Sequence, residues 1–313
     1  MVALTSLLLW LLAFIGEAKC DEETYSGQID SRFLRATVRI QTSAQTGGTG
    51  FLVSSEIAEG KRVYFLVTNK HLVGEYSLGS GEVDRYYDYL EVFFYKSQAG
   101  AVAPIRVWLK DGSGELNTRK VVPYPKAHID IAVVSVAEDM ARVDDIDRMA
   151  FDISFIRPVS ELKGLSVGAG DLVFVLGYPF GIYSSTNYYP IAKSGFISSG
   201  IGEELVVRFP VREKSGGSID RELRGKLILL DGTLVNGNSG GPVILPAGRR
   251  ERIAEQGGVE RTQGVIPNLV VGVQSQSVVE AGISVAFSSE YVLELINGAL
   301  GKATFVDEKD LIR

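Results

Sequence analysis

This 313-residue chain has few histidines and cysteines, and its basic side chains do not outnumber its acidic ones. With two histidines and one cysteine, it cannot build a zinc site of nitrogen and sulfur ligands without unusual carboxylate help, so we expect no metal and no cofactor. Its formal net charge of −6 argues against a general affinity for nucleic acid or anionic lipid. No glycine cluster has the strand, lysine and helix context of a phosphate-binding loop.

The chain is rich in apolar residues and in glycine. Hydrophobic residues make up 45% of it, charged residues 22%, and there are 35 glycines, a composition that favours a large core with many tight turns. Short apolar runs recur between segments rich in Gly, Ser, Asp or Pro. Many short strands with this spacing predict an all-β barrel or sandwich. The runs are residues 90–95, 172–176, 205–209, 227–230 and 269–273.

The amino terminus has the pattern of a signal peptide. Residues 2–15 are almost wholly apolar, and small and polar residues follow through Cys20. We therefore expect residues 1–20 to direct secretion or export to a periplasm, with a membrane anchor through the same residues as the alternative. No stable membrane insertion is expected elsewhere. Cleavage after Cys20 would remove the single thiol, so the mature chain would have no disulfide.

The run Gly-Asn-Ser-Gly-Gly-Pro at residues 237–242 is the most informative motif. Glycine accepts backbone angles that other residues avoid, so the N–H groups of Gly237 and Ser239 can converge on one point and hold an oxyanion. Ser239 would then be an exposed nucleophile on the same turn. A polar loop joining two strands is the other interpretation.

A serine nucleophile needs a base, and imidazole is the usual one at neutral pH. His71 ends the strand-like run at residues 63–71, whereas His128 lies in a polar loop. Asp130 comes just before the apolar run at residues 131–134, where its carboxylate could be shielded from water and orient an imidazole. Taken singly, His71 could be a surface histidine and Asp130 a strand-capping acid.

Three blocks of the sequence resemble the motifs of trypsin-like serine peptidases, in the chain order His, Asp, Ser. They are Thr-Asn-Lys-His at 68–71, His-Ile-Asp-Ile-Ala-Val at 128–133, and the serine run at 237–242. The similarity spans about residues 33–298 and is closest to the bacterial HtrA/Deg peptidases. Further similar segments are residues 49–53, 170–172, 177–181, 194–198 and 282–286.

The resemblance implies both a mechanism and a fold. Ser239 would attack the scissile carbonyl, His71 would take and return the proton, Asp130 would hold His71, and the amides of Gly237 and Ser239 would form the oxyanion hole. The fold would be two antiparallel six-stranded β-barrels with the active cleft between them.

The expected domain organisation follows from the motif positions. Residues 31–145 would form the first barrel, which contains His71 and Asp130, and residues 146–300 the second, which contains Ser239. A C-terminal helix is predicted at residues 288–298, from a serine cap and apolar spacing of three to four residues. Residues 301–313 would be a tail, too short for the PDZ domain that HtrA enzymes usually carry.

The α/β-hydrolase fold is the strongest rival, because residues 237–241 also match its Gly-x-Ser-x-Gly elbow. That fold takes its catalytic histidine from downstream of the serine, and no histidine follows Ser239. The residues after Pro242 are a poor helix start and a reasonable short strand. This pattern argues against an esterase on that fold.

The expected function is a serine endopeptidase whose partners are protein or peptide substrates. In the family, the residue six before the serine often lies at the floor of the primary pocket; here it is Thr233, which is uncharged. Cleavage after small or medium apolar residues follows as a hypothesis. A protease-fold binding or chaperone-like protein with a latent site and a serine esterase remain as alternatives, and nothing in the sequence specifies a number of subunits.

Overall fold

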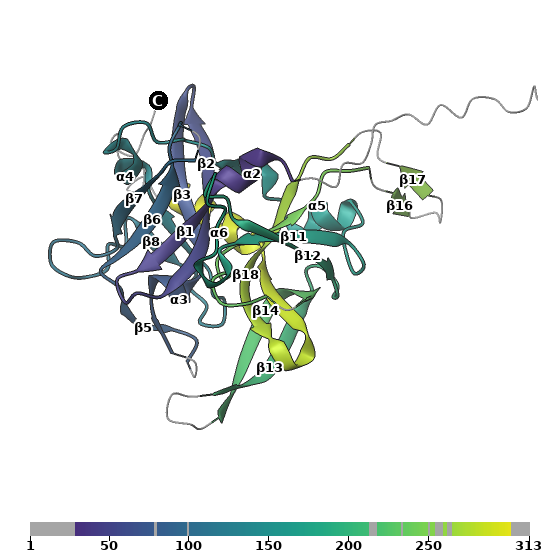
Figure 1. The fold of residues 1–313 in the computed structure, drawn as a ribbon. Helices are drawn as coiled ribbons and strands as arrows, with labels where there is room; N and C mark the ends of the chain where they lie inside the picture. Colours follow the sequence, from purple (N-terminus) through teal and green to yellow (C-terminus); the bar gives the residue numbers. More distant parts are fainter. Residues whose placement is uncertain are drawn as a thin grey trace, which may run out of the picture.

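Two curled antiparallel sheets account for most of the molecule, and the helices are few and short (Figure 1). The computed structural model describes residues 29–77, 80–98, 100–212, 218–232, 234–249, 251–253, 259–261 and 265–301. The predicted all-β fold with two barrels is confirmed. The predicted leader, residues 1–20, lies outside the described residues. Within the described part of the chain, no helix has the length and apolar character needed to cross a membrane.

The first sheet contains eight strands in the order β7-β6-β1-β2-β3-β9-β8, with β10 pairing in parallel with β2. Six strands are four residues or longer, as the two-barrel prediction expects, and β8 and β10 are short additions of three and two residues. The strands are β1 (Thr37–Thr42), β2 (Gly47–Ala58), β3 (Lys61–Thr68), β6 (Tyr89–Tyr95), β7 (Val102–Trp108), β8 (Val121–Pro123), β9 (Ala132–Ser135) and β10 (Phe151–Asp152).

The second sheet closes on itself. Six strands form a ring in the order β12-β11-β15-β18-β19-β14, and pairing between β12 and β14 completes it. β13 extends this barrel as a hairpin with β14, which projects from the body of the molecule (Figure 1). The strands are β11 (Leu172–Gly177), β12 (Ile191–Ile197), β13 (Glu204–Arg212), β14 (Ser218–Asp231), β15 (Pro242–Leu245), β18 (Leu269–Val278) and β19 (Ile283–Ser288).

The remaining elements are short, apart from one helix. Small hairpins join β4 to β5 and β16 to β17. Their bounds are β4 (Gly74–Tyr76), β5 (Val83–Tyr86), β16 (Glu251–Ile253) and β17 (Val259–Arg261). The helices are α2 (Ser31–Ala36), α3 (Lys70–Val73), α4 (Ala137–Ala141), α5 (Val159–Gly164) and α6 (Glu290–Leu300), with 3-10 turns η1 (Ile153–Phe155), η2 (Pro179–Gly181) and η3 (Val279–Ala281).

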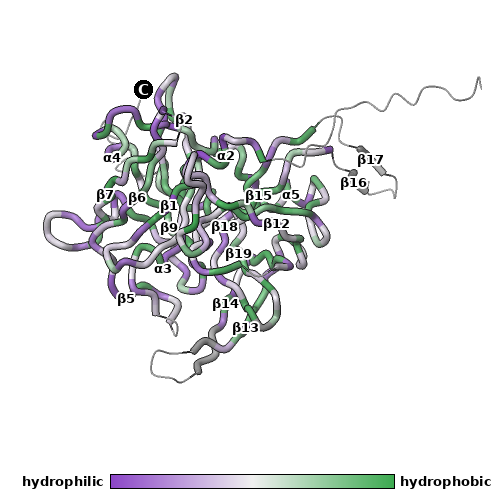
Figure 2. The backbone as a smooth tube through the Cα atoms, in the orientation of Figure 1, coloured by the Kyte–Doolittle hydropathy of each residue, from purple (hydrophilic) through white to green (hydrophobic). Residues whose placement is uncertain are grey.

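Apolar side chains fill each barrel, because alternate strand residues point inward. Strand β7 shows this period of two, with buried and exposed residues alternating along it. Figure 2 shows the hydrophobic segments concentrated in the central strands and the hydrophilic ones mainly in outer loops. Fully buried examples are Val38, Ile40 and Leu66 in the first barrel and Val173, Val243 and Val271 in the second.

A third apolar cluster joins the two barrels. Phe51 and Ile131 of the first pack in one cluster with Leu227 and Phe287 of the second. Helix α6 belongs to the same cluster through Tyr291, and it contacts β8 and β9 as well as β19. The predicted C-terminal helix therefore packs against both barrels. Burial of this shared surface holds the two barrels in one relative position, which is what a site between them requires.

Candidate active site

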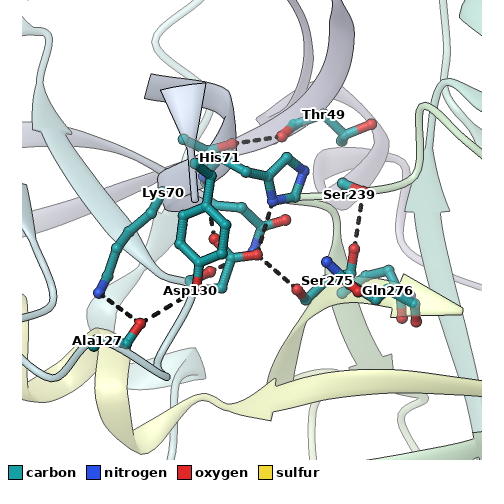
Figure 3. Close-up of polar contacts among 12 residues, drawn as sticks. Thr49, Lys70, His71, Ala127, Asp130, Ser239, Ser275 and Gln276 are labelled. Atoms are coloured by element: carbon teal, nitrogen blue, oxygen red, sulfur yellow. Dashed lines mark hydrogen bonds and ion pairs between the residues drawn. The ribbon is translucent and has the colours of Figure 1, made fainter. Parts of the chain in front are cut away.

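His71 and Asp130 are brought together by pairing of adjacent strands. His71 lies in α3, directly after β3, and Asp130 directly precedes the strand region that pairs with β3 through Thr68 and Ala132. The His71 Nδ1 lies 2.7 Å from Asp130 Oδ2, and the backbone N–H of His71 donates to Asp130 Oδ1 at 3.1 Å (Figure 3). When Nδ1 donates to the carboxylate, Nε2 is left able to accept a proton.

The Asp130 side chain is fully buried, so its charge requires hydrogen-bond donors. Ser275 Oγ donates to Asp130 Oδ2 at 2.7 Å, and Asn69 Nδ2 donates to the Asp130 carbonyl at 2.6 Å. Ser275 and His71 hold the carboxylate in one orientation, and Asn69 holds the backbone of the same residue. The His71 side chain is 25% exposed, so the imidazole lies between the buried carboxylate and solvent.

Ser239 lies on the turn that enters β15, and it lines the same cavity as His71. The volume of this first cavity is about 470 Å³. The Ser239 hydroxyl donates to the backbone carbonyl of Ser275 at 2.9 Å, rather than to the imidazole (Figure 3). Ser275 therefore contacts both halves of the site, with its hydroxyl on Asp130 and its carbonyl on Ser239.

Glycine is required at two positions of this turn. Gly237 has φ 101° and Gly240 has φ 83°, conformations that L-residues with a side chain rarely adopt. A Cβ at Gly237 would clash with the Tyr178 carbonyl oxygen, and one at Gly240 with the Thr49 carbonyl oxygen. Among the described residues, the N–H groups of Gly237 and Ser239 have no protein acceptor. Two such donors could stabilise an oxyanion.

Thr49 of β2 connects the first barrel to the serine turn. Its Oγ1 donates to the Gly237 carbonyl at 2.6 Å and accepts from the Tyr178 N–H at 3.1 Å. Its backbone N–H donates to the Ser239 carbonyl at 2.8 Å. The position of the turn thus depends on a residue from the opposite barrel.

Lys70, the residue before His71, is buried beneath the site. Its Nζ donates to the carbonyl of Lys126 at 2.8 Å and approaches that of Ala127 at 3.4 Å, in the loop that leads to Asp130. Burial lowers the pKa of the Lys70 ammonium from 10.5 to about 8, against the opposing effect of the negative charge of Asp130. This side chain anchors the loop that carries the carboxylate.

The described lining of the first cavity is polar and apolar, with His71 as its one titratable side chain. No Asp, Glu, Lys or Arg occurs among the described residues that line it. Its lining residues are His71, Phe180, Leu234, Val235, Asn236, Asn238, Ser239, Gln274, Ser275, Gln276, Ser277 and Val279. Thr233, the predicted pocket residue, lies outside the described residues. In the part of the chain that the structure describes, no group of three His, Cys, Asp or Glu side chains could hold a metal ion.

The supporting residues Thr49, Asn69, Lys70 and Ser275 were not predicted from the sequence as parts of the site. Asn69 and Lys70 gave only a weak signal in the sequence: they are polar residues directly between an apolar strand and His71. Both are buried in the structure, which is unusual for polar residues. Ser275 is likewise a polar residue that comes shortly after an apolar run, at residues 269–273. No local pattern identifies the partner of Thr49, which is 188 residues away.

Comparison with known proteins gives one clear relationship. Residues 48–250 match the family model of the trypsin-like peptidase domain. Solved structures that resemble the chain include the Rv3671c protease in its inactive form, at 16% identity and a TM-score of 0.43, covering 86% of this chain and 91% of that one. The active form of the same protease, from M. tuberculosis, matches at 16% identity and a TM-score of 0.43, covering 85% of this chain and 82% of that one.

No curated protein matches the chain. The family model alone covers more than half of the chain, including the positions of His71, Asp130 and Ser239. The chain therefore belongs to the trypsin-like peptidase family.

Proposed function

We propose that this protein is a serine endopeptidase that cleaves protein substrates through Ser239, His71 and Asp130, by way of an acyl-enzyme. The observation that carries the proposal is the 2.7 Å contact between His71 Nδ1 and the buried Asp130 carboxylate, at the edge of a cavity that Ser239 also lines. A buried acid that holds an imidazole beside a serine is the arrangement that general-base activation needs.

Each proposed role follows from the position of the group. His71 Nε2 takes the proton of the Ser239 hydroxyl as Oγ attacks the scissile carbonyl carbon, and Asp130 stabilises the imidazolium that forms. The N–H groups of Gly237 and Ser239 donate to the oxyanion. His71 then gives the proton to the leaving amine as the C–N bond breaks. Water, deprotonated by His71, hydrolyses the acyl-enzyme and restores the Ser239 hydroxyl.

The reaction requires one side-chain movement. The Ser239 hydroxyl donates to the Ser275 carbonyl, so it has to turn toward His71 Nε2 before attack. The same hydrogen bond favours the second candidate function, a protease-fold binding or chaperone-like protein whose site stays latent. The two candidates differ in whether the hydroxyl leaves Ser275 at a catalytically useful rate.

The chemistry of the first cavity supports a substrate preference. Because its described lining residues include no Asp, Glu, Lys or Arg, we propose that it accepts a small or medium apolar residue before the scissile bond. Thr233 is proposed as a further contact at the pocket floor. From the sequence motifs we also propose a place near the HtrA/Deg peptidases, and from the apolar leader an exported location.

Reaction with a fluorophosphonate probe tests the proposal directly. We expect the wild type to be labelled at Ser239, found by peptide mass spectrometry, and to degrade casein, which an esterase would leave intact. Ser239→Ala should not be labelled, and His71→Ala should be labelled at least about 10³-fold more slowly. His128→Ala is the matched control, since His128 is exposed in the neighbouring loop and should react like the wild type. Folded wild-type protein that resists the probe would support the latent binding protein instead.

A further inference from the structure

A second cavity, of about 240 Å³, lies against the serine turn. Phe180 and Asn236 line both cavities, so the second one adjoins the first across these two residues. Ser239 lines only the first cavity, and Gly237 only the second. The second cavity is lined by Arg39, Gln41, Gln45, Gly47, Gly48, Tyr178, Phe180, Gly181, Asn236 and Gly237.

Arg39 is the one charged side chain among the described residues that line this second cavity. Its guanidinium carbon lies 4.9 Å from the ring centroid of Phe93, and its Nη1 donates to the Tyr188 hydroxyl at 3.2 Å. Tyr188 in turn stacks on Phe93, with ring centroids 5.9 Å apart. The guanidinium is therefore held in place by aromatic contacts, and little side-chain entropy remains to be lost when it binds a ligand.

No carboxylate among the described residues that line the second cavity balances the charge of Arg39. The described residues that line the second cavity include no Asp or Glu, and none of the ion pairs among the described residues involves Arg39. Its polar neighbours Gln41 and Gln45 are hydrogen-bonded to each other at 2.7 Å. A preorganised guanidinium without a carboxylate partner, facing a cavity, is suited to a planar anion such as a carboxylate.

The order of the two cavities along a bound peptide follows from the proposed function, on which this inference rests. The scissile carbonyl would lie at the N–H groups of Gly237 and Ser239. The residue before it would enter the first cavity, beside Ser239 and Ser275, and the leaving segment would run past Gly237 toward Arg39. Phe180, whose side chain is largely exposed, stands between the two directions.

We propose that Arg39 makes the second cavity a subsite for a carboxylate on the leaving segment, within the first two residues after the scissile bond. The carboxylate could be an Asp or Glu side chain or the free C-terminus of a short substrate. In both cases a bidentate or single charge-assisted hydrogen bond to the guanidinium provides the selectivity.

Binding to Ser239→Ala protein tests the subsite without depending on catalysis. Fluorescent peptides would share one sequence before the scissile bond and carry Glu or Gln after it, each with a free or an amidated C-terminus. We expect about tenfold tighter binding of the Glu peptide than of the Gln peptide, weakening as salt is raised. Comparison of the free and amidated ends separates the side-chain carboxylate from the terminal one.

Three further variants in the Ser239→Ala background sharpen the test. Arg39→Gln should bind all peptides equally, whereas Arg39→Lys should keep part of the preference because it keeps the charge. Arg106→Gln is the matched control: its guanidinium carbon also lies 4.9 Å from an aromatic ring, that of Tyr89, but Arg106 is not part of the cavity wall. It should keep the full preference. Thermal unfolding of each variant checks that it is folded.

Equal binding of carboxylate-bearing and neutral peptides, or a preference that survives in folded Arg39→Gln, would overturn the inference. The wild type, given the same peptides, separates this result from the proposed function. Cleavage without a carboxylate preference would refute the subsite alone. A carboxylate preference in binding, with no cleavage by the wild type, would support the subsite and refute the endopeptidase.

Discussion

The first barrel holds His71 and Asp130 in direct contact with each other, whereas the second barrel presents Ser239 on a turn held by hydrogen bonds from Thr49 of the first barrel. One hydrogen bond joins the imidazole to the carboxylate, and a second is donated to the same carboxylate by the backbone N–H of His71. The Ser239 hydroxyl donates a hydrogen bond to the backbone carbonyl of Ser275. The half of the candidate site that we propose as acid and base is thus assembled, while the hydroxyl of the proposed nucleophile has still to turn toward it.

The difference has a structural cause. His71 and Asp130 are delivered by β3 and β9, two strands that pair within one sheet, so the register of that pair places them. Ser239 reaches the same cavity only because the barrels pack together, and Thr49 supplies the hydrogen bonds that set the position of its turn. The positions of His71 and Asp130 therefore depend on the register of one strand pair, whereas the position of Ser239 depends on how the two barrels pack together.

The largest effect is expected from Asp130→Asn, which changes the assembled half. An amide in place of the carboxylate favours the wrong imidazole tautomer, so kcat on a peptide substrate should fall by about 10⁴-fold near neutral pH. Measurement of kcat against pH and of thermal stability separates this effect from unfolding. Asp144→Asn, at an exposed position, is the control and should behave like the wild type. A rate for folded Asp130→Asn within a few-fold of the wild-type rate would remove Asp130 from the mechanism.

Thr49→Val tests the position of the Ser239 turn, which depends on the contact between the two barrels. Valine has nearly the same shape but leaves the Gly237 carbonyl and the Tyr178 N–H without their partner. We expect kcat/KM to fall by about 10- to 100-fold because the proposed oxyanion donors, the N–H groups of Gly237 and Ser239, shift. The low-field NMR signal of the His71 Nδ1 proton should remain.

Thr46→Val is the matched control for this prediction. It removes a hydroxyl that bonds only Thr42 in the exposed turn before β2, so activity should not change. Loss of the His71 proton signal in Thr49→Val would show that the two halves are not separable in the way the structure suggests.

The smallest effect is expected from Lys70, whose ammonium holds the loop that leads to Asp130. The prediction is that its contribution to the free energy of unfolding depends on pH. Because the pKa of Lys70 is lowered to about 8 in the folded protein and returns to its usual 10.5 on unfolding, the unfolded state binds more protons between these values. The contribution of Lys70 to stability should therefore rise as pH increases from about 8 to about 10.5. Asp130 and Glu82 oppose the shift through their negative charge.

Urea unfolding at pH 7 and pH 10 measures this contribution. The free energy of unfolding of the wild type, relative to that of Lys70→Met, should increase by about 1 to 2 kcal/mol over this range. Lys126→Met, at an exposed position of the adjoining loop, should show no such difference from the wild type. A difference between wild type and Lys70→Met that stays constant with pH would contradict burial of the charged amine.

Much of the fold was accessible from local patterns in the chain. Apolar runs such as residues 172–176 and 269–273 predicted strands that the structure contains, because alternating or continuous apolar residues have few other ways to be buried. The helix predicted at residues 288–298 is observed as α6. Its contact with both barrels was not predictable, since it depends on which surfaces the packed sheets leave to be covered.

The same division applies to the site. The amino-acid sequence by itself determined the glycine-rich turn around Ser239 and the strand-end positions of His71 and Asp130, because backbone angles and apolar periodicity are properties of neighbouring residues. Tertiary structure alone decided that Thr49 and Ser275 support the site and that the Ser239 hydroxyl donates to Ser275. Hydrogen-bond partners are selected by distance in space. Strand pairing within the second barrel brings Ser239 to Ser275, 36 residues away, and the packing of the two barrels brings Thr49 to Gly237, 188 residues away.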